Sequence, residues 1–213
     1  MRRALLLLLL VASGAQARVP DLAFREGRLG DYLGTAPVVL VLGYFGCVNL
    51  CGTTLEGVSL ALRNTGLVPE RDYRALFVSV DPRDERAPCE RRAGWHFLTG
   101  AHAAAALAET VGFRYDYDAD SGQFAHPAGF IVLTPQGEVA RYFTGVRFDA
   151  AELRAAIAQA ALGRTQTTFE RVLLLCFHDP VSGKHSAAVL MALRLAMALF
   201  LVALGFVAWR KLR

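Results

Sequence analysis

The chain has 213 residues, of which 54% are hydrophobic and 20% are charged, and this composition excludes an intrinsically disordered protein. The length suits one domain of ordinary size with additional segments at its ends. The formal charge of +4 does not indicate a nucleic-acid-binding surface, because the basic excess lies at the two ends of the chain. Between Arg18 and Gly163, 17 acidic residues outnumber 14 basic ones.

The N-terminal segment has the pattern of a secretory signal peptide. Arg2 and Arg3 give it a positive start, and the apolar stretch that follows, residues 4–12, is too short to cross a hydrocarbon layer of ~30 Å. An Ala-x-Ala sequence then ends at Ala17. We therefore expect residues 1–17 to be removed after export from a bacterial cytoplasm.

The C-terminal segment has the pattern of a membrane anchor. Residues 186–209 contain a single charge, Arg194, and as a helix they would be about 36 Å long, enough to cross a bilayer with some tilt. The basic tail, residues 210–213, favours the cytoplasmic side. We expect a transmembrane helix at 186–209 in the bacterial inner membrane, a cytoplasmic tail at 210–213 and a juxtamembrane linker at 164–185.

The part between these ends, residues 18–163, is expected to be one α/β domain in the periplasm. Apolar runs predict strands at residues 37–45, 73–80, 129–134 and 138–144, and helical spacing or alanine-rich composition predicts helices at 53–64, 101–111 and 150–162. The order β-α-β-α-β-β-α is typical of a thioredoxin-like domain. The predicted architecture is therefore a thioredoxin-like domain followed by a C-terminal transmembrane helix.

Two of the four cysteines, Cys47 and Cys51, lie where the first buried strand is expected to end and a helix to begin. Residues four apart share one helical face, and a helix N-terminus lowers the pKa of a thiol. Thioredoxin-type oxidoreductases have one residue fewer between their cysteines, and the wider spacing suits an ion held between two thiolates. Soft thiolates favour Cu(I), with Zn²⁺ as a second candidate. A plain structural disulfide is the alternative.

The best candidate for a third ligand is His126, which directly precedes Pro127 and the third expected strand. In a thioredoxin-like layout this loop faces the cysteine corner. An imidazole with two thiolates can hold Cu(I), and also Cu(II) if a further ligand joins. The alternative is a loop histidine that is satisfied by its neighbours.

The chain resembles the Sco/SenC family of copper chaperones for cytochrome c oxidase assembly over roughly residues 33–162. The resemblance rests on GYFGCVNLC, FVSVDPRD, GWHFLTG, FRYDYDADSGQFAHPAGFIVLTPQGEVARYF and the linker LLLCFHDPVSGKHS. It implies that Cys47 and Cys51 are the two copper thiolates and His126 the histidine ligand, and that the chain is of the C-terminally anchored bacterial type. Many members have Pro and Asp between the cysteines, where this chain has residues 48–50 as Val-Asn-Leu.

The leading interpretation is a metallochaperone that binds one copper ion and delivers it to the copper-binding subunit of cytochrome c oxidase. Its other expected partners are the inner membrane and a periplasmic dithiol reductant or copper donor, with no nucleic acid. The main alternative is a thiol–disulfide oxidoreductase that reduces cysteines of the oxidase copper site through Cys47 and Cys51. A peroxiredoxin-like peroxidase and a copper sensor are the remaining alternatives, and Cys89 and Cys176 have no assigned role.

Overall fold

The computed structural model describes residues 18–47, 51–85 and 93–165, the single positions 195, 200 and 210, and of Cys51 the backbone alone. In chain order its elements are β1 (Ala23–Phe24), β2 (Gly27–Arg28), the 3-10 helix η1 (Leu29–Tyr32), β3 (Val38–Gly43), α1 (Cys51–Thr65), β4 (Arg74–Ser79), β5 (Trp95–Leu98), α2 (Ala101–Thr110), β6 (Asp116–Asp118), β7 (Gln123–Ala125), β8 (Gly129–Leu133), β9 (Val139–Thr144) and α3 (Ala150–Ala161).

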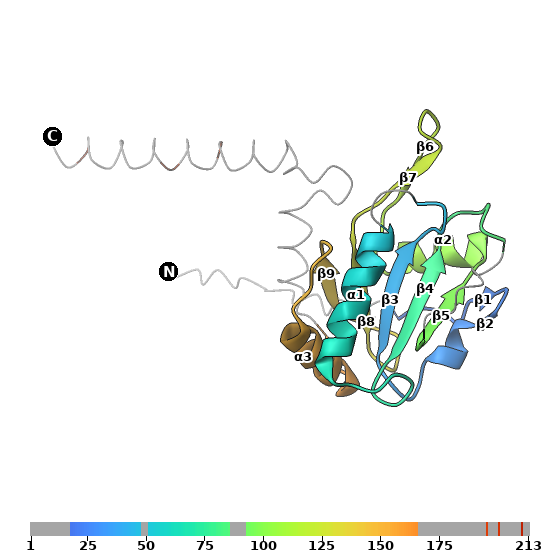
Figure 1. The fold of residues 1–213 in the computed structure, drawn as a ribbon. Helices are drawn as coiled ribbons and strands as arrows, with labels where there is room; N and C mark the ends of the chain where they lie inside the picture. The colour runs from blue at the N-terminus through green and yellow to red at the C-terminus, as the bar shows by residue number, and fades with distance from the viewer. Residues whose placement is uncertain are drawn as a thin grey trace, which may run out of the picture.

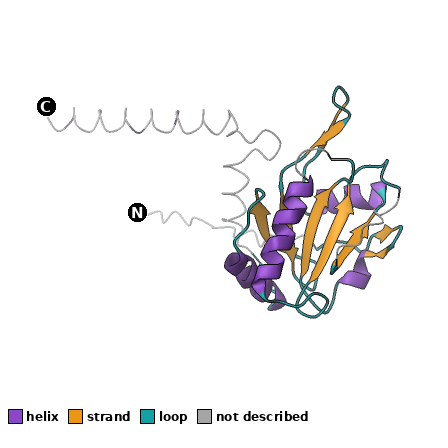
Figure 2. Ribbon diagram, viewed as in Figure 1, coloured by secondary structure: helices purple, strands orange, loops and turns teal. Residues whose placement is uncertain are grey.

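A five-stranded sheet in the order β5-β4-β3-β8-β9 forms the centre of the domain. Strands β3, β4 and β5 are parallel to one another, whereas β8 and β9 run antiparallel to their neighbours. Helices α1 and α3 cover one face of the sheet and α2 covers the other (Figures 1 and 2). This is the mixed α/β arrangement that the sequence predicts for a thioredoxin-like domain.

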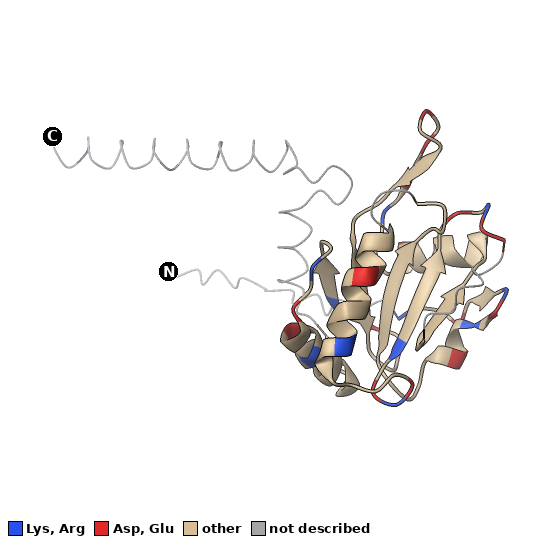
Figure 3. Ribbon diagram, in the orientation of Figure 1, with Lys and Arg blue, Asp and Glu red and all other residues tan. Residues whose placement is uncertain are grey.

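The central strand β3 shows why these residues form a buried sheet. Every residue of its Val-rich run is buried, because layers of helices cover both faces. Since side chains alternate along a strand, Val38 and Leu40 pack with α2, while Val39 and Val41 pack with α1 and α3. Each such side chain stabilises the fold by roughly 1.5–3 kcal/mol. Most charged residues lie in the loops, on the helices and at the ends or edges of strands, outside the buried centre of the sheet (Figure 3).

Helix α3 begins at a capped N-terminus, since the Asp149 side chain accepts a hydrogen bond of 2.8 Å from the backbone of Glu152. Helix α1 begins two residues before the predicted start and so includes Cys51 as its first residue. Each helix and strand predicted for the domain is confirmed, and its ends lie within two residues of the predicted ones. The structure also contains elements that the sequence did not predict.

The additional elements are short and partly exposed. They are the edge strand β5, the pair β1–β2 with η1, and the β6–β7 hairpin, which extends as a narrow arm beyond the sheet in Figure 1. The hairpin lies between α2 and β8, so the chain leaves it directly into the loop that carries His126.

The expected signal peptide, 1–17, and nearly all of the expected linker and anchor, 164–209, lie outside the described residues. In the part of the chain that is described, no helix is both long enough and apolar enough to cross a membrane. Cys89 and Cys176 also lie outside it.

Candidate metal centre

Cys47 lies where the sequence places it, just after the carboxyl end of β3. The strand ends at Gly43, Tyr44 is buried, and the half-buried Cys47 follows three residues later. Since α1 starts at Cys51, the two cysteines flank the connection from strand to helix. The N-terminal end of a helix favours negative charge, and this setting therefore stabilises a thiolate at the start of α1.

Tyr44 brings the loop with His126 to the same end of β3. Its ring contacts the His126 imidazole edge-on, with centroids 5.9 Å apart, and contacts Phe124 at 5.5 Å. Its hydroxyl group donates a 2.7 Å hydrogen bond to Oε1 of Gln123. Because Tyr44 stands three residues before Cys47, these contacts dock the base of the β6–β7 hairpin beside the cysteine segment.

The hydrogen bond of the His126 ring sets its tautomer. Nδ1 lies 3.0 Å from the carbonyl oxygen of Pro127, and a carbonyl can only accept, so Nδ1 carries a proton. In the neutral ring the lone pair is then on Nε2, which is the arrangement of a metal-binding histidine with a backbone partner. Burial lowers the pKa of His126, although the hydrogen bond to Pro127 acts in the opposite direction. The imidazole is therefore neutral near pH 7 and able to bind a metal.

The ligand set Cys47, Cys51 and His126 stays a prediction, because the Cys51 side chain and residues 48–50 lie outside the described part. Within that part, no three or more His, Cys, Asp or Glu side chains gather as a metal site. The described donors, a thiol and a neutral imidazole, suit a soft or borderline cation such as copper.

The structure adds Asp84 to the site, a residue that ends the motif FVSVDPRD and that had no predicted role. Its Oδ2 accepts hydrogen bonds from the Phe45 backbone, at 2.8 Å, and from the Ser79 hydroxyl group, at 2.6 Å. Asp84 therefore fixes the chain two residues before Cys47 to the end of β4. A run of charges directly after a buried strand is the sequence pattern that could have indicated Asp84. The carboxyl ends of parallel strands meet at one edge of a sheet, so residues after β4 are expected to lie near residues after β3.

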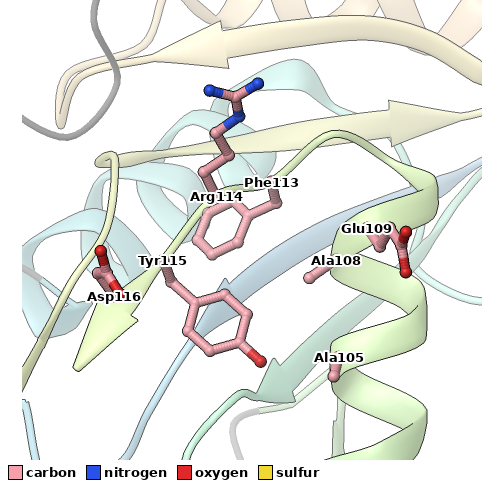
Figure 4. Close-up of a pocket in the computed structure, with 7 residues that line it drawn as sticks. All are labelled: Ala105, Ala108, Glu109, Phe113, Arg114, Tyr115 and Asp116. Atoms are coloured by element: carbon pink, nitrogen blue, oxygen red, sulfur yellow. The ribbon is translucent and has the colours of Figure 1, made fainter.

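A cavity of about 420 Å³ lies next to His126, between α2 and residues 113–116. Figure 4 shows Phe113 and Tyr115 side by side in its lining, with Arg114 pointing away from them. The Phe113 ring also contacts His126, with centroids 5.7 Å apart. The described lining contains no cysteine or histidine, so the cavity adds no thiolate or imidazole ligand to the predicted set.

The comparisons with known proteins lead to SCO1/SenC proteins. The family model described as SCO1/SenC matches residues 29–162. The chain is similar to Arabidopsis thaliana ScoI with copper bound, at 19% identity and a TM-score of 0.55, over 67% of this chain and 96% of that one. It is also similar to apo Sco1 from Thermus thermophilus, at 26% identity and a TM-score of 0.52, over 69% of this chain and 92% of that one. No curated protein matches the chain.

A third solved structure is BsSco, described as a member of the Sco family of cytochrome c oxidase assembly proteins with a disulfide switch. The identity is 16% and the TM-score 0.54, over 70% of this chain and 95% of that one. These structural likenesses establish a shared fold, and the family match covers the whole sheet with its helices.

Proposed function

Because this chain belongs to the SCO1/SenC family, we propose that it binds copper and takes part in the assembly of cytochrome c oxidase. In detail, it is a metallochaperone that holds one copper ion on Cys47, Cys51 and His126. The observation that carries this proposal is the contact of Tyr44 with His126, which joins the histidine loop to the strand that leads into Cys47. Copper in the Arabidopsis relative supports the choice of metal.

The chemistry of delivery is ligand exchange. The thiolates of Cys47 and Cys51 and the Nε2 atom of His126 hold the copper ion at the strand-to-helix corner of the domain, where the thiolates of an acceptor replace them one at a time. The ion keeps its charge throughout, the acceptor thiols release protons, and the cysteines of this chain take up protons when the ion leaves. Transfer therefore needs no electron donor and runs down a difference in affinity.

The place of action that fits this chemistry is the periplasmic face of the bacterial inner membrane. The proposed anchor, residues 186–209, confines the domain to the membrane plane and raises its effective concentration near the copper-binding subunit of the oxidase. An oxidising compartment converts the cysteine pair to a disulfide, which cannot bind copper. A periplasmic dithiol reductant or a copper donor is therefore a second partner.

The competing function is a thiol–disulfide oxidoreductase that reduces the cysteines of the oxidase copper site. It is supported by the position of the cysteine pair at the strand-to-helix corner of a thioredoxin-like domain, and by the disulfide switch described for BsSco. This activity uses Cys47 and Cys51 without His126, and the histidine therefore distinguishes the two functions.

The test is a copper titration of the mature chain, purified in detergent and fully reduced under anaerobic conditions, with a competing chelator and mass spectrometry as the readout. We expect one copper ion per wild-type chain and almost none in Cys47→Ser, Cys51→Ser and His126→Ala. His102→Ala, on the exposed side of α2, is the matched control and should bind like the wild type. If His126→Ala loads as well as the wild type, the chaperone assignment is wrong and the reductase becomes the better account.

A further inference from the structure

The turn at residues 81–84 follows β4 and lies beside the cysteine end of β3. The two strands are parallel and in register up to the pair Gly43 and Ser79, so their carboxyl ends meet at one edge of the sheet. The pairing continues by one more hydrogen bond, from the Val80 backbone to the Gly43 carbonyl at 2.8 Å. The backbone pairing alone therefore fixes the segment after β3 relative to the segment after β4, without any contribution from the side chains of the turn.

Asp84 fixes the segment on the cysteine side. One of its carboxylate oxygens accepts hydrogen bonds from the Phe45 backbone and from the nearly inaccessible Ser79 hydroxyl group. A charged acceptor makes both bonds stronger than neutral ones. The backbone that leads into Cys47 is thus bound to the turn.

Arg83 connects the turn to the β6–β7 hairpin. Its guanidinium group holds both carboxylate oxygens of Asp81 at 2.6–2.9 Å, and the Asp81 side chain is only 3% exposed. The same group donates to the Gly122 carbonyl at 3.1 Å and lies 5.5 Å from the ring centre of Tyr117 and 5.7 Å from that of Phe124. A buried carboxylate therefore anchors a planar cation that binds both strands of the hairpin.

The contacts of Arg83 with the hairpin also restrict the position of the His126 loop. Phe124 is two residues before the histidine, and its ring is in contact with Arg83 and with Tyr44. Tyr44 in turn contacts His126. The histidine loop is thus held by the turn through Arg83 and by the end of β3 through Tyr44.

We propose that Arg83 and Asp84 are positioning residues of the metal centre, which together set the separation between the Cys47 segment and the His126 loop. The inference rests on the proposed copper function, and it gives each of the two residues a different metal ligand to position. Arg83 acts through His126, and Asp84 acts through Cys47. Neither residue binds the metal itself.

The sharpest variant is Arg83→Lys, which keeps a positive charge beside the buried Asp81 but loses the planar fork that spans Asp81, Gly122 and the two rings. We expect faster amide hydrogen exchange in β7 and at His126 and Ala128, with unchanged exchange in β3 and β4. We also expect a roughly 10-fold loss of copper affinity, the usual scale for residues that orient metal ligands. The matched control is Arg71→Lys, whose side chain makes the same two-pronged bond to Asp72 at the opposite end of β4 and should change neither quantity.

A double-mutant comparison separates positioning from a general loss of stability. In a His126→Ala background, whose weaker copper binding is measured with a weaker competing chelator, Arg83→Lys should have no further effect on affinity. Asp84→Ala should lower the affinity in both backgrounds, because it acts on the cysteine side.

Two results would overturn the inference while leaving the proposed function intact. One is equal loss of affinity by Arg83→Lys with and without His126. The other is wild-type hydrogen exchange in the hairpin of Arg83→Lys. If instead the wild-type chain binds no copper at all, the proposed function fails, and faster exchange in the hairpin still supports Arg83 as the residue that holds the His126 loop.

Discussion

The Tyr44 ring stands almost perpendicular to the His126 imidazole, at 80° between their planes and 5.9 Å between their centroids. The two residues are far apart in the chain, and the contact joins the end of the central strand to the loop after the hairpin. Everything proposed for the metal centre depends on this connection, since it places the imidazole near the segment that carries Cys47.

Tyr44→Phe removes the hydroxyl group that donates to Gln123 and keeps the ring against His126 and Phe124. We expect the free energy of unfolding to fall by about 1 kcal/mol, the usual net value of one hydrogen bond. Copper affinity should stay within roughly two- to threefold of the wild type, because the ring contact that places His126 is kept. Urea unfolding and a chelator competition measure the two quantities, and a large loss of affinity with unchanged stability would contradict this division of roles.

The pH dependence of stability tests the environment of His126. Because burial lowers its pKa in the folded protein, the unfolded chain binds a proton more readily as the pH falls below about 6.5. The wild type without metal should therefore lose stability between pH 6.5 and the lower pKa of the folded state, and this loss should be absent above pH 6.5. His126→Asn lacks the titrating ring, so its stability should fall less over the same range. Parallel curves for the two proteins, measured by urea unfolding with a chelator present, would show that the imidazole is not buried.

Thr54 in α1 is 3% exposed, and its hydroxyl group has no hydrogen-bond partner in the described part of the chain. Thr54→Val keeps the shape and removes the unsatisfied group, so the free energy of unfolding should stay equal or rise by about 1 kcal/mol. Ser59→Ala is the control on the same helix, because the Ser59 hydroxyl group donates to the Leu55 carbonyl at 2.7 Å. A lower thermal midpoint for Thr54→Val would mean that its hydroxyl group is bonded in solution.

Gly57 allows α1 to approach the loop between β9 and α3. A Cβ atom at this position would lie 2.1 Å from the Val146 carbonyl oxygen, a clash with backbone that cannot be relieved by a rotamer change. Gly57→Ala should cost about 1–3 kcal/mol or more of the free energy of unfolding. Gly52→Ala is the comparison on the same helix, where an added Cβ would meet no atom within 4 Å among the described residues outside the helix backbone. This substitution should instead be neutral or stabilising by up to about 1 kcal/mol. Equal effects of the two substitutions in a denaturant titration would contradict the packing seen here.

The sequence was sufficient for the elements with strong apolar patterns. Strands β3, β4, β8 and β9 read as apolar or alternating runs, and α1 and α3 as helices, because each buries a face that its own residues specify. The edge strand β5 was missed because it has four residues and only its last is buried. The hairpin strands β6 and β7 have three residues each and no buried one, so local pattern carried no signal for them.

For the candidate site, the sequence predicted the positions of two residues but not the contacts that connect them. Topology alone placed Cys47 at the strand-to-helix corner and His126 in the loop before β8. The contacts that connect them are between residues distant in the chain, as in the bond from Arg83 to Gly122, 39 residues apart. Such pairs depend on where the hairpin lies relative to the ends of β3 and β4, which no local pattern specifies.

The central claim is that two sulfur atoms and one imidazole nitrogen hold a single copper ion. The most direct measurement is X-ray absorption at the copper K-edge of the mature chain, loaded with one equivalent of Cu(I) and kept reduced in detergent. The account predicts two sulfur ligands and one nitrogen ligand with the outer-shell scattering of an imidazole ring. A first shell of sulfur alone, without imidazole scattering, would contradict it.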